Sequence, residues 1–142
     1  IALPDASMRA YDADTMRRDM GMIVSLFVVG AGRVARGEVL SGRVFIQTHA
    51  MGHLLPLLAH VLDSDDKHNL DGLDAYRRFE QVFPEVGAEI NAALSRDPIG
   101  AALGLLDIYE RVLRDVDGYP AHAVQTARAY LRGIQSPPYR QI

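Results

Sequence analysis

Apolar residues recur along this chain every three to four positions, which is the spacing of one face of an α-helix. The first such run predicts a helix over residues 13–35, with Asp12 or Asp14 as its N-cap and Gly37 as its C-terminal cap. Its repeating apolar positions are Met16, Met20, Ile23, Val24, Phe27, Val28 and Ala31. No segment shows the alternation of a half-buried strand.

The most apolar stretch, residues 38–62, predicts the central core helix. Pro56 lies inside it and predicts a kink, because proline lacks an N–H and its ring crowds the carbonyl four residues back. Gly42 and Gly52 weaken the helix, and their small size favours close approach of another helix. The expected buried positions are Val39, Phe45, Ile46, Leu54, Leu57, Leu58 and Val61.

Shorter helices follow a polar connector over residues 63–72. Asp97 is expected to cap the third of them, and Pro84 and Pro98 suit first-turn positions because a helix start needs no N–H there. The expected helices cover residues 73–82, 85–95, 98–113 and 121–132. We therefore predict an all-α antiparallel bundle of five to six helices over residues 13–134, with a lead-in linker over 1–12 and an extended tail over 135–142.

Composition narrows the function classes. The chain has 142 residues, 49% of them hydrophobic and 23% charged, which fits one globular domain. A net charge of -3 provides no basic footprint for nucleic acid. The absence of cysteine excludes disulfides and thiolate chemistry and favours a reducing, cytoplasmic location. The longest apolar run, residues 20–31, is too short to cross a bilayer, so no membrane partner is expected.

The chain begins at Ile1 with a short apolar and proline-containing segment. Two explanations are open: a trimmed or processed terminus, or the removal of an upstream domain. Asp5 and Arg9 stand where the apolar part of a signal peptide would lie, so no secretory signal is expected.

Motifs for phosphate binding and nucleophilic catalysis are missing. The chain contains neither GxxxxGK[ST] nor GxSxG, and Gly30 and Gly32 lie in a helical pattern where small residues ease packing. Asp63, Asp65 and Asp66 resemble part of a calcium loop in composition but lack its ordered spacing and closing glutamate, so we interpret them as a solvated turn.

Polar residues gather on the predicted central helix. Arg43 and Gln47 are four apart and share a face, as do His49 and His53, with His60 two turns further on. The histidine spacing occurs in helical metal sites, but there is no HExxH motif. We interpret the histidines as a partly buried polar line and predict no metal site.

The spacing Arg43-x5-His49 resembles that of the HEPN ribonucleases, although Val44 stands where a polar residue usually follows the arginine. The resemblance implies an arginine that stabilises a phosphorane and a histidine that acts as general acid or base. RNA would be the partner in that case only.

A longer resemblance covers most of the chain, from about residue 19 to residue 114. Residues 35–43 read ARGEVLSGR and residues 74–90 read DAYRRFEQVFPEVGAEI. Together they resemble the helical C-terminal domain of aminoglycoside-type nucleotidyltransferases, which is HEPN-related. From the residues alone, Phe79, Val82 and Phe83 should anchor a turn, Pro84 should restart the helix, and Arg77 and Arg78 should face Glu80 or Glu85.

The resemblance implies that the catalytic residues lie in a separate domain and not in this chain. Family members carry an N-terminal domain with a GS motif and paired aspartates that bind magnesium and a nucleoside triphosphate, and this chain contains none of it. The helical domain packs against that partner and completes the cleft for a small-molecule acceptor, an aminoglycoside or similar polyhydroxylated amine. Expected acceptor-binding residues are Glu38, Arg43, Gln47, His49 and His53.

In some family members an acidic residue near the start of the helical domain is the general base. By position the candidates are Asp12, Asp14 and Asp19, with Glu38 less favoured. Their alternative role is to supply N-cap and first-turn charges, which the helix dipole favours.

Three hypotheses result. The first is a substrate-binding or accessory domain of a nucleotidyltransferase-like protein, without catalysis of its own. The second is a free-standing HEPN-type domain, either a ribonuclease or the partner of a separate nucleotidyltransferase. The third is a helical homodimer that pairs through an apolar face of its first or second helix.

Overall fold

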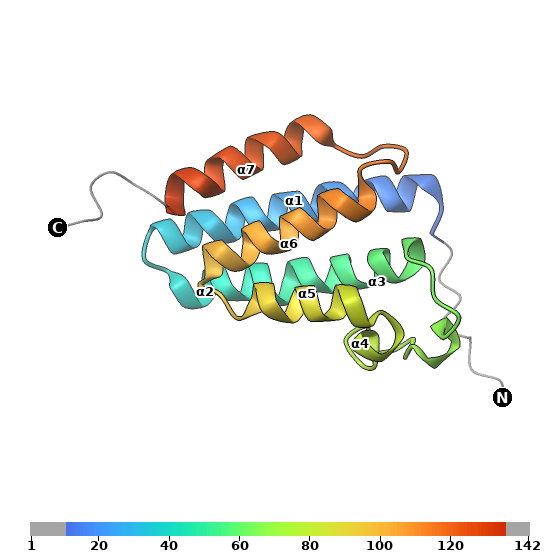
Figure 1. Ribbon diagram of the computed structural model, residues 1–142. Helices are drawn as coiled ribbons and strands as arrows, with labels where there is room; N and C mark the ends of the chain where they lie inside the picture. The colour runs from blue at the N-terminus through green and yellow to red at the C-terminus, as the bar shows by residue number, and fades with distance from the viewer. Residues whose placement is uncertain (1–10, 136–142) are drawn as a thin grey trace.

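The computed structural model describes residues 11–135, which form helices joined by turns and contain no strand (Figure 1). The elements are α1 (Ala13–Ala35), α2 (Val39–Val44), the π-helix η2 (Phe45–Ala50), α3 (Met51–Val61), the 3-10 helix η3 (Lys67–Asn69), α4 (Phe79–Val82), α5 (Pro84–Leu94), α6 (Pro98–Leu113) and α7 (Ala121–Gln135). The predicted all-α bundle is confirmed. Of the expected linker over residues 1–12 and tail over 135–142, residues 1–10 and 136–142 lie outside the described residues, and Gln135 is the last residue of α7.

Local signals set the ends of α1 as expected. The Asp12 carboxylate accepts a hydrogen bond from the Thr15 backbone N–H at 2.7 Å, which satisfies one of the unpaired donors of the first turn. At the other end Gly37 has a φ of 84°, a left-handed conformation that glycine adopts without steric cost.

The predicted central helix is continuous but not uniform. Elements α2, η2 and α3 follow one another without a break, and the six residues of η2 have π-helical hydrogen bonding. Pro56 lies inside α3, where Leu54, Leu57 and Leu58 are buried. The local widening at η2 was not predicted from the sequence. Such π-turns are rare and are frequent at functional sites.

Two glycines bring α1 and α2 into close contact. A methyl group on Gly30 would lie 2.8 Å from Ile46 Cγ1, and one on Gly42 would lie 2.8 Å from the Gly30 carbonyl. The expected close approach is therefore confirmed at Gly42. At Gly52 the space is open, so that glycine has no such role.

The core lies where α6 packs against its neighbours. In Figure 1 the long helices lie roughly parallel, with α1 and α6 between α7 on one side and α3 and α5 on the other. Tyr109 of α6 is fully buried, and its hydroxyl donates to the Met20 carbonyl at 2.9 Å. The largest of the other fully buried side chains are Phe27, Phe79, Met20, Ile23, Ile46, Met51, Leu54, Leu57 and Leu58.

The predicted helix over residues 73–82 is wrong in its first half. Asp71 and Asp74 accept hydrogen bonds from the Leu73 and Tyr76 backbone N–H groups at 2.9 and 3.0 Å, which favours turns over helix. Arg78 then adopts a left-handed φ of 64° before the four residues of α4.

The arginines of this turn also differ from expectation. Arg77 and Arg78 pair with Asp71, at 3.3 and 3.9 Å, rather than with Glu80 or Glu85. The turn they belong to is anchored as predicted, with Phe79, Val82 and Phe83 all buried and Pro84 opening α5.

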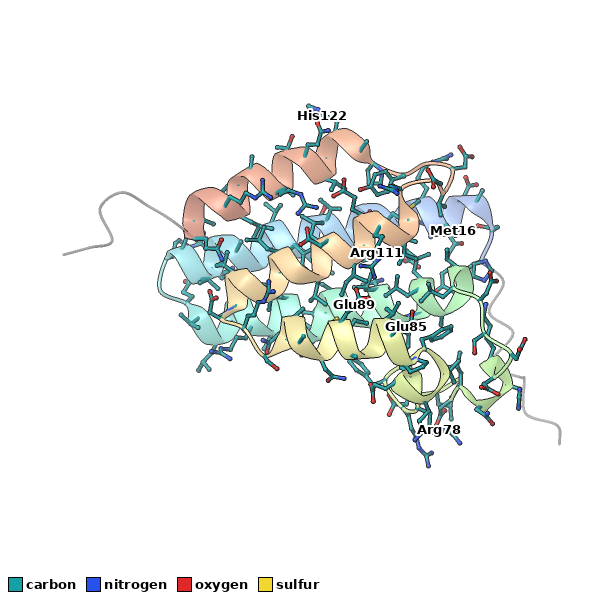
Figure 2. All side chains as sticks on the ribbon, in the orientation of Figure 1. Met16, Arg78, Glu85, Glu89, Arg111 and His122 are labelled. Carbon is teal, nitrogen blue, oxygen red and sulfur yellow. The ribbon has the colours of Figure 1, made fainter. Side chains whose placement is uncertain are left out.

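Ion pairs link the outer helices to α6. Figure 2 shows Glu89 of α5 and Arg111 of α6 facing one another, and their nearest atoms are 2.5 Å apart. Arg128 of α7 pairs with Asp107 and Glu110 of α6. Between residues 11 and 135, no helix is both long enough and apolar enough to cross a bilayer.

Candidate functional site

Helix α1 runs antiparallel to the continuous helix η2–α3. The two helices contact one another along a partly exposed line of side chains, which we name the α1–α3 seam. Three contacts define it. Within the helices, Arg33 meets Phe45, whose ring centroid is 5.5 Å from the guanidinium carbon, and Asp19 meets His53. Just before α1, the Tyr11 ring lies 5.2 Å from the His60 ring. By helical spacing from these contacts, we assign to the seam Asp19, Met22, Leu26, Val29 and Arg33 on one side and Phe45, His49, His53, Pro56 and His60 on the other.

Asp19 and His53 form the polar centre of the seam. His53 Nδ1 lies 3.4 Å from Asp19 Oδ1, and the two side chains are 42% and 16% exposed. With its proton on Nδ1, the imidazole points that proton at the carboxylate and leaves the Nε2 lone pair available as a base. The pair therefore places a carboxylate beside a hydrogen-bond acceptor. From the sequence, Asp19 was a candidate general base and His53 a candidate acceptor-binding residue.

The other acidic candidates are engaged locally. Asp12 caps α1, and the Thr15 N–H that it binds lowers the pKa of its carboxyl group. Asp14 pairs with Arg17 at 3.6 Å, and Glu38 pairs with Arg36 at 3.3 Å. Asp12 therefore has the expected N-cap role.

Asp14 also lies on a different side of α1 from Asp19. The two are five residues apart, which places them about 140° from one another around an α-helix. Asp19, in contrast, faces α3, where it meets His53. A single acidic face built from all the aspartate candidates is therefore not formed.

The structure does not gather Arg43, Gln47 and His49 into one site. Arg43 and His49 are exposed and Gln47 is half-buried, and His49 packs edge-on against the Phe45 ring at 5.4 Å. Within residues 11–135 no hydrogen bond or ion pair joins Arg43 to His49. Arg43 lies in α2, just before the π-helical segment, and His49 lies inside that segment.

Next to the seam, a hollow of about 530 Å³ opens between α3 and the connector that follows it. We name it the α3–connector hollow. Its residues are Tyr11, Leu55, Pro56, Ala59, His60, Lys67, His68, Leu70, Asp71, Gly72, Leu73 and Ala75. Tyr11, Pro56 and His60 adjoin the seam, so the hollow continues it, about 10 Å along α3 from His53 at 1.5 Å per residue.

The hollow was not predicted from the sequence, because the acidic connector over residues 63–72 is typical of a solvated turn. Two signals were available there. Leu70 is an isolated apolar residue in a polar segment, and Lys67 is the only lysine in the chain. Both line the hollow.

The seam histidines do not converge on a metal. His49 and His60 are eleven residues apart, roughly 16 Å along a helix. In the part of the chain that the structure describes, no three His, Asp or Glu side chains gather closely enough to hold an ion.

Comparisons of the chain with protein families, with curated proteins and with solved structures give no match.

Proposed function

We propose that this chain is the substrate-binding domain of a nucleotidyltransferase-like protein, and that the α1–α3 seam receives a polyhydroxylated amine of the aminoglycoside type. One observation carries the proposal: Asp19, which is largely buried, and His53, which is 42% exposed, meet on the seam with His53 Nδ1 3.4 Å from the carboxylate. An N-terminal nucleotidyltransferase domain is the proposed partner. Magnesium and the nucleoside triphosphate belong to that domain.

The chemistry of the pair suits such an acceptor. An ammonium group is attracted by the Asp19 carboxylate, which is only 16% exposed and so is less screened by water than the aspartates of the first turn. A neighbouring hydroxyl can then donate to His53 Nε2, and a base at hydrogen-bond distance prepares that hydroxyl for attack.

The apolar part of the seam suits the rest of the acceptor. Met22 is 42% exposed and Leu26 is half-buried, both on the stripe of α1 that carries Asp19. Half-exposed apolar side chains of this kind can pack against the C–H surface of a sugar ring while the charged groups fix its orientation.

The segment that carries the family resemblance also has a place beside this site. Phe79, Val82 and Phe83 are buried and hold the turn that precedes α5. Asp71 and Ala75, just before this turn, line the hollow that continues the seam. The resembling segment therefore packs beside the α3–connector hollow, about 10 Å along α3 from the Asp19–His53 pair.

Calorimetric titration with kanamycin, a polyhydroxylated amine, tests the proposal. At low ionic strength we expect Asp19→Asn to weaken binding about tenfold, which corresponds to about 1.4 kcal/mol. Asp14→Asn is the matched control, because it removes the same charge from the same helix at an exposed position away from the seam. Equal affinities for the two variants would contradict the proposal.

One observation favours the ribonuclease hypothesis as a second candidate. His49 lies within the π-helix Phe45–Ala50 and Arg43 lies just before it, and π-turns recur at functional sites. An assay with single-stranded RNA separates the two candidates. Cleavage that Arg43→Ala and His49→Ala both abolish, and His53→Ala does not, would favour the ribonuclease and count against the acceptor site.

An exposed apolar surface on α2 supports the homodimer hypothesis. Val39, Leu40 and Val44 of α2 are 38%, 83% and 45% exposed, an unusual concentration of apolar side chains on one short helix. Analytical ultracentrifugation decides this point. A mass that rises with concentration, and stops rising in Leu40→Asp, would support pairing through α2, and a monomer at all concentrations would exclude it.

A further inference from the structure

The α3–connector hollow has the size and lining of a small-molecule site. Its volume of about 530 Å³ falls within the range of ligand pockets, roughly 300–1,000 Å³. Leu55, Pro56, Ala59 and Leu70 provide an apolar floor from α3 and the connector. An occupant therefore needs an apolar part that fits between a helix and a loop.

The polar groups around this floor are mainly cationic or neutral. Lys67 is half-buried at the rim, where its ammonium group lies 3.4 Å from the His60 carbonyl oxygen. His60 and His68 are exposed beside it. In the described part of the chain, Lys67 makes no ion pair with a carboxylate.

The one acid in the lining, Asp71, is already paired with cationic side chains. Asp71 lies 3.3 Å from Arg77 Nη1 and 3.9 Å from Arg78 Nη2, and it also accepts the Leu73 backbone N–H. The Leu73 N–H, and to a lesser extent the Arg77 guanidinium, hold the pKa of Asp71 below its usual range. The negative charge of Asp71 is therefore already paired within the turn.

Other acids of the connector do not change this balance. Asp63, Asp65 and Asp66 are exposed and are not among the residues that line the hollow. The rim therefore favours an anion, whereas the seam at Asp19 favours a cation.

We propose that the α3–connector hollow binds a small anion that carries an apolar ring, an aromatic phosphate monoester or carboxylate, with the anionic group at Lys67. The ring lies on the floor formed by Leu55, Pro56 and Leu70. The imidazoles of His60 and His68 flank the anionic group. This site is independent of the proposed acceptor site and does not require it.

The single lysine makes a direct test possible. Reductive methylation with ¹³C-formaldehyde labels Lys67 and the α-amino group, and it keeps the charge of the lysine. We expect phenyl phosphate to shift the Lys67 methyl signal in a saturable way, with half-saturation at or below about 1 mM, equivalent to about -4 kcal/mol. Benzoate tests the carboxylate arm in the same experiment.

Two further probes and two variants complete the design. Inorganic phosphate should bind at least about tenfold more weakly, because it leaves the apolar floor unused, and benzylamine should produce no shift at Lys67. In amide NMR titrations Lys67→Gln should weaken phenyl phosphate binding at least about fivefold, and Arg132→Gln, which removes an exposed cation from α7, should leave it unchanged.

Several outcomes would overturn the proposal. These are an unmoved Lys67 signal with phenyl phosphate and with benzoate, equal binding of phenyl phosphate and inorganic phosphate, or tighter binding of benzylamine. None of them bears on the kanamycin titration, which depends on Asp19. The two proposals can therefore fail separately.

Discussion

Tyr109 is the polar residue most deeply embedded in the core. Its side chain is fully buried, and its hydroxyl donates to the Met20 carbonyl of α1 across the bundle. Burial, and to a lesser extent the neighbouring Tyr119, raise the pKa of Tyr109 well above that of a free tyrosine. The folded protein thus keeps this hydroxyl protonated at a pH where the unfolded chain loses the proton.

We expect Tyr109→Phe to show a stability change that depends on pH. At pH 7 the variant should lose about 1 kcal/mol of unfolding free energy with the hydrogen bond to Met20. Above about pH 10 the unfolded wild type loses a proton that the folded protein keeps, so wild-type stability falls as pH rises and the difference from Tyr109→Phe narrows.

Urea denaturation at pH 7 and pH 11 measures this difference. Tyr130→Phe is the control, because Tyr130 is 43% exposed and its change should leave the slope of stability against pH as in the wild type. A Tyr109→Phe difference that is the same at both pH values would contradict the expectation.

Arg78 is the one residue other than glycine with a positive φ among residues 11–135. A left-handed conformation costs a side-chain-bearing residue about 1–2 kcal/mol, and glycine avoids most of this cost. Arg78→Gly should therefore leave the protein as stable as the wild type or stabilise it by up to about 1 kcal/mol, despite losing a 3.9 Å ion pair.

The matched control for this change is Arg77→Gly. Arg77 precedes Arg78 in the same turn and pairs with the same aspartate, but it has no positive φ to relieve. We expect it to lower the thermal midpoint. A lower midpoint for Arg78→Gly than for Arg77→Gly would show that the left-handed conformation is not the dominant cost.

At the scale of elements, the sequence predicts the helices well wherever a local signal marks the end. Asp12, Gly37, Pro84 and Pro98 each stand at the helix boundary that their chemistry favours. The prediction fails over residues 73–78 because aspartate side chains capture backbone N–H groups there. The π-helix could not be predicted, since it depends on how the continuous helix packs against α1.

The contact between α1 and α2 gives a matched pair of glycine substitutions. A methyl group on Gly42 would meet Val34 and lie 2.8 Å from the Gly30 carbonyl, whereas one on Gly52 would meet nothing within 4 Å. We expect Gly42→Ala to destabilise the protein by about 1–3 kcal/mol through overpacking, and Gly52→Ala to stabilise it by about 0.5–1 kcal/mol through helix propensity.

Urea denaturation of both variants checks this expectation. The opposite signs are the essential result, because the two substitutions are chemically identical and lie in the same continuous helix. A stabilising Gly42→Ala would mean that the helices separate at little cost and that the close crossing is not important for stability.

At the scale of the whole molecule, the site was only partly predictable. Asp19 and His53 were both candidates, but their meeting depends on the register between two antiparallel helices, which no local pattern reveals. Arg43 and His49 would cooperate only under the ribonuclease hypothesis, and within residues 11–135 no hydrogen bond or ion pair joins them. The hollow escaped prediction because its wall is a polar connector folded back on α3.

The central claim is that the seam at Asp19 and His53 binds the acceptor. Imidazole ¹H–¹⁵N correlation spectra test this claim directly. The chain has five histidines, so the ring signals of each can be followed separately. His53 and His49 lie on the seam, and His122 projects from α7 away from it (Figure 2).

During a kanamycin titration, we predict saturable shifts of the His53 ring signals, with His122 unmoved and the His53 response lost in Asp19→Asn. An unchanged His53 spectrum at millimolar kanamycin, or equal small shifts at all five histidines, would contradict the account.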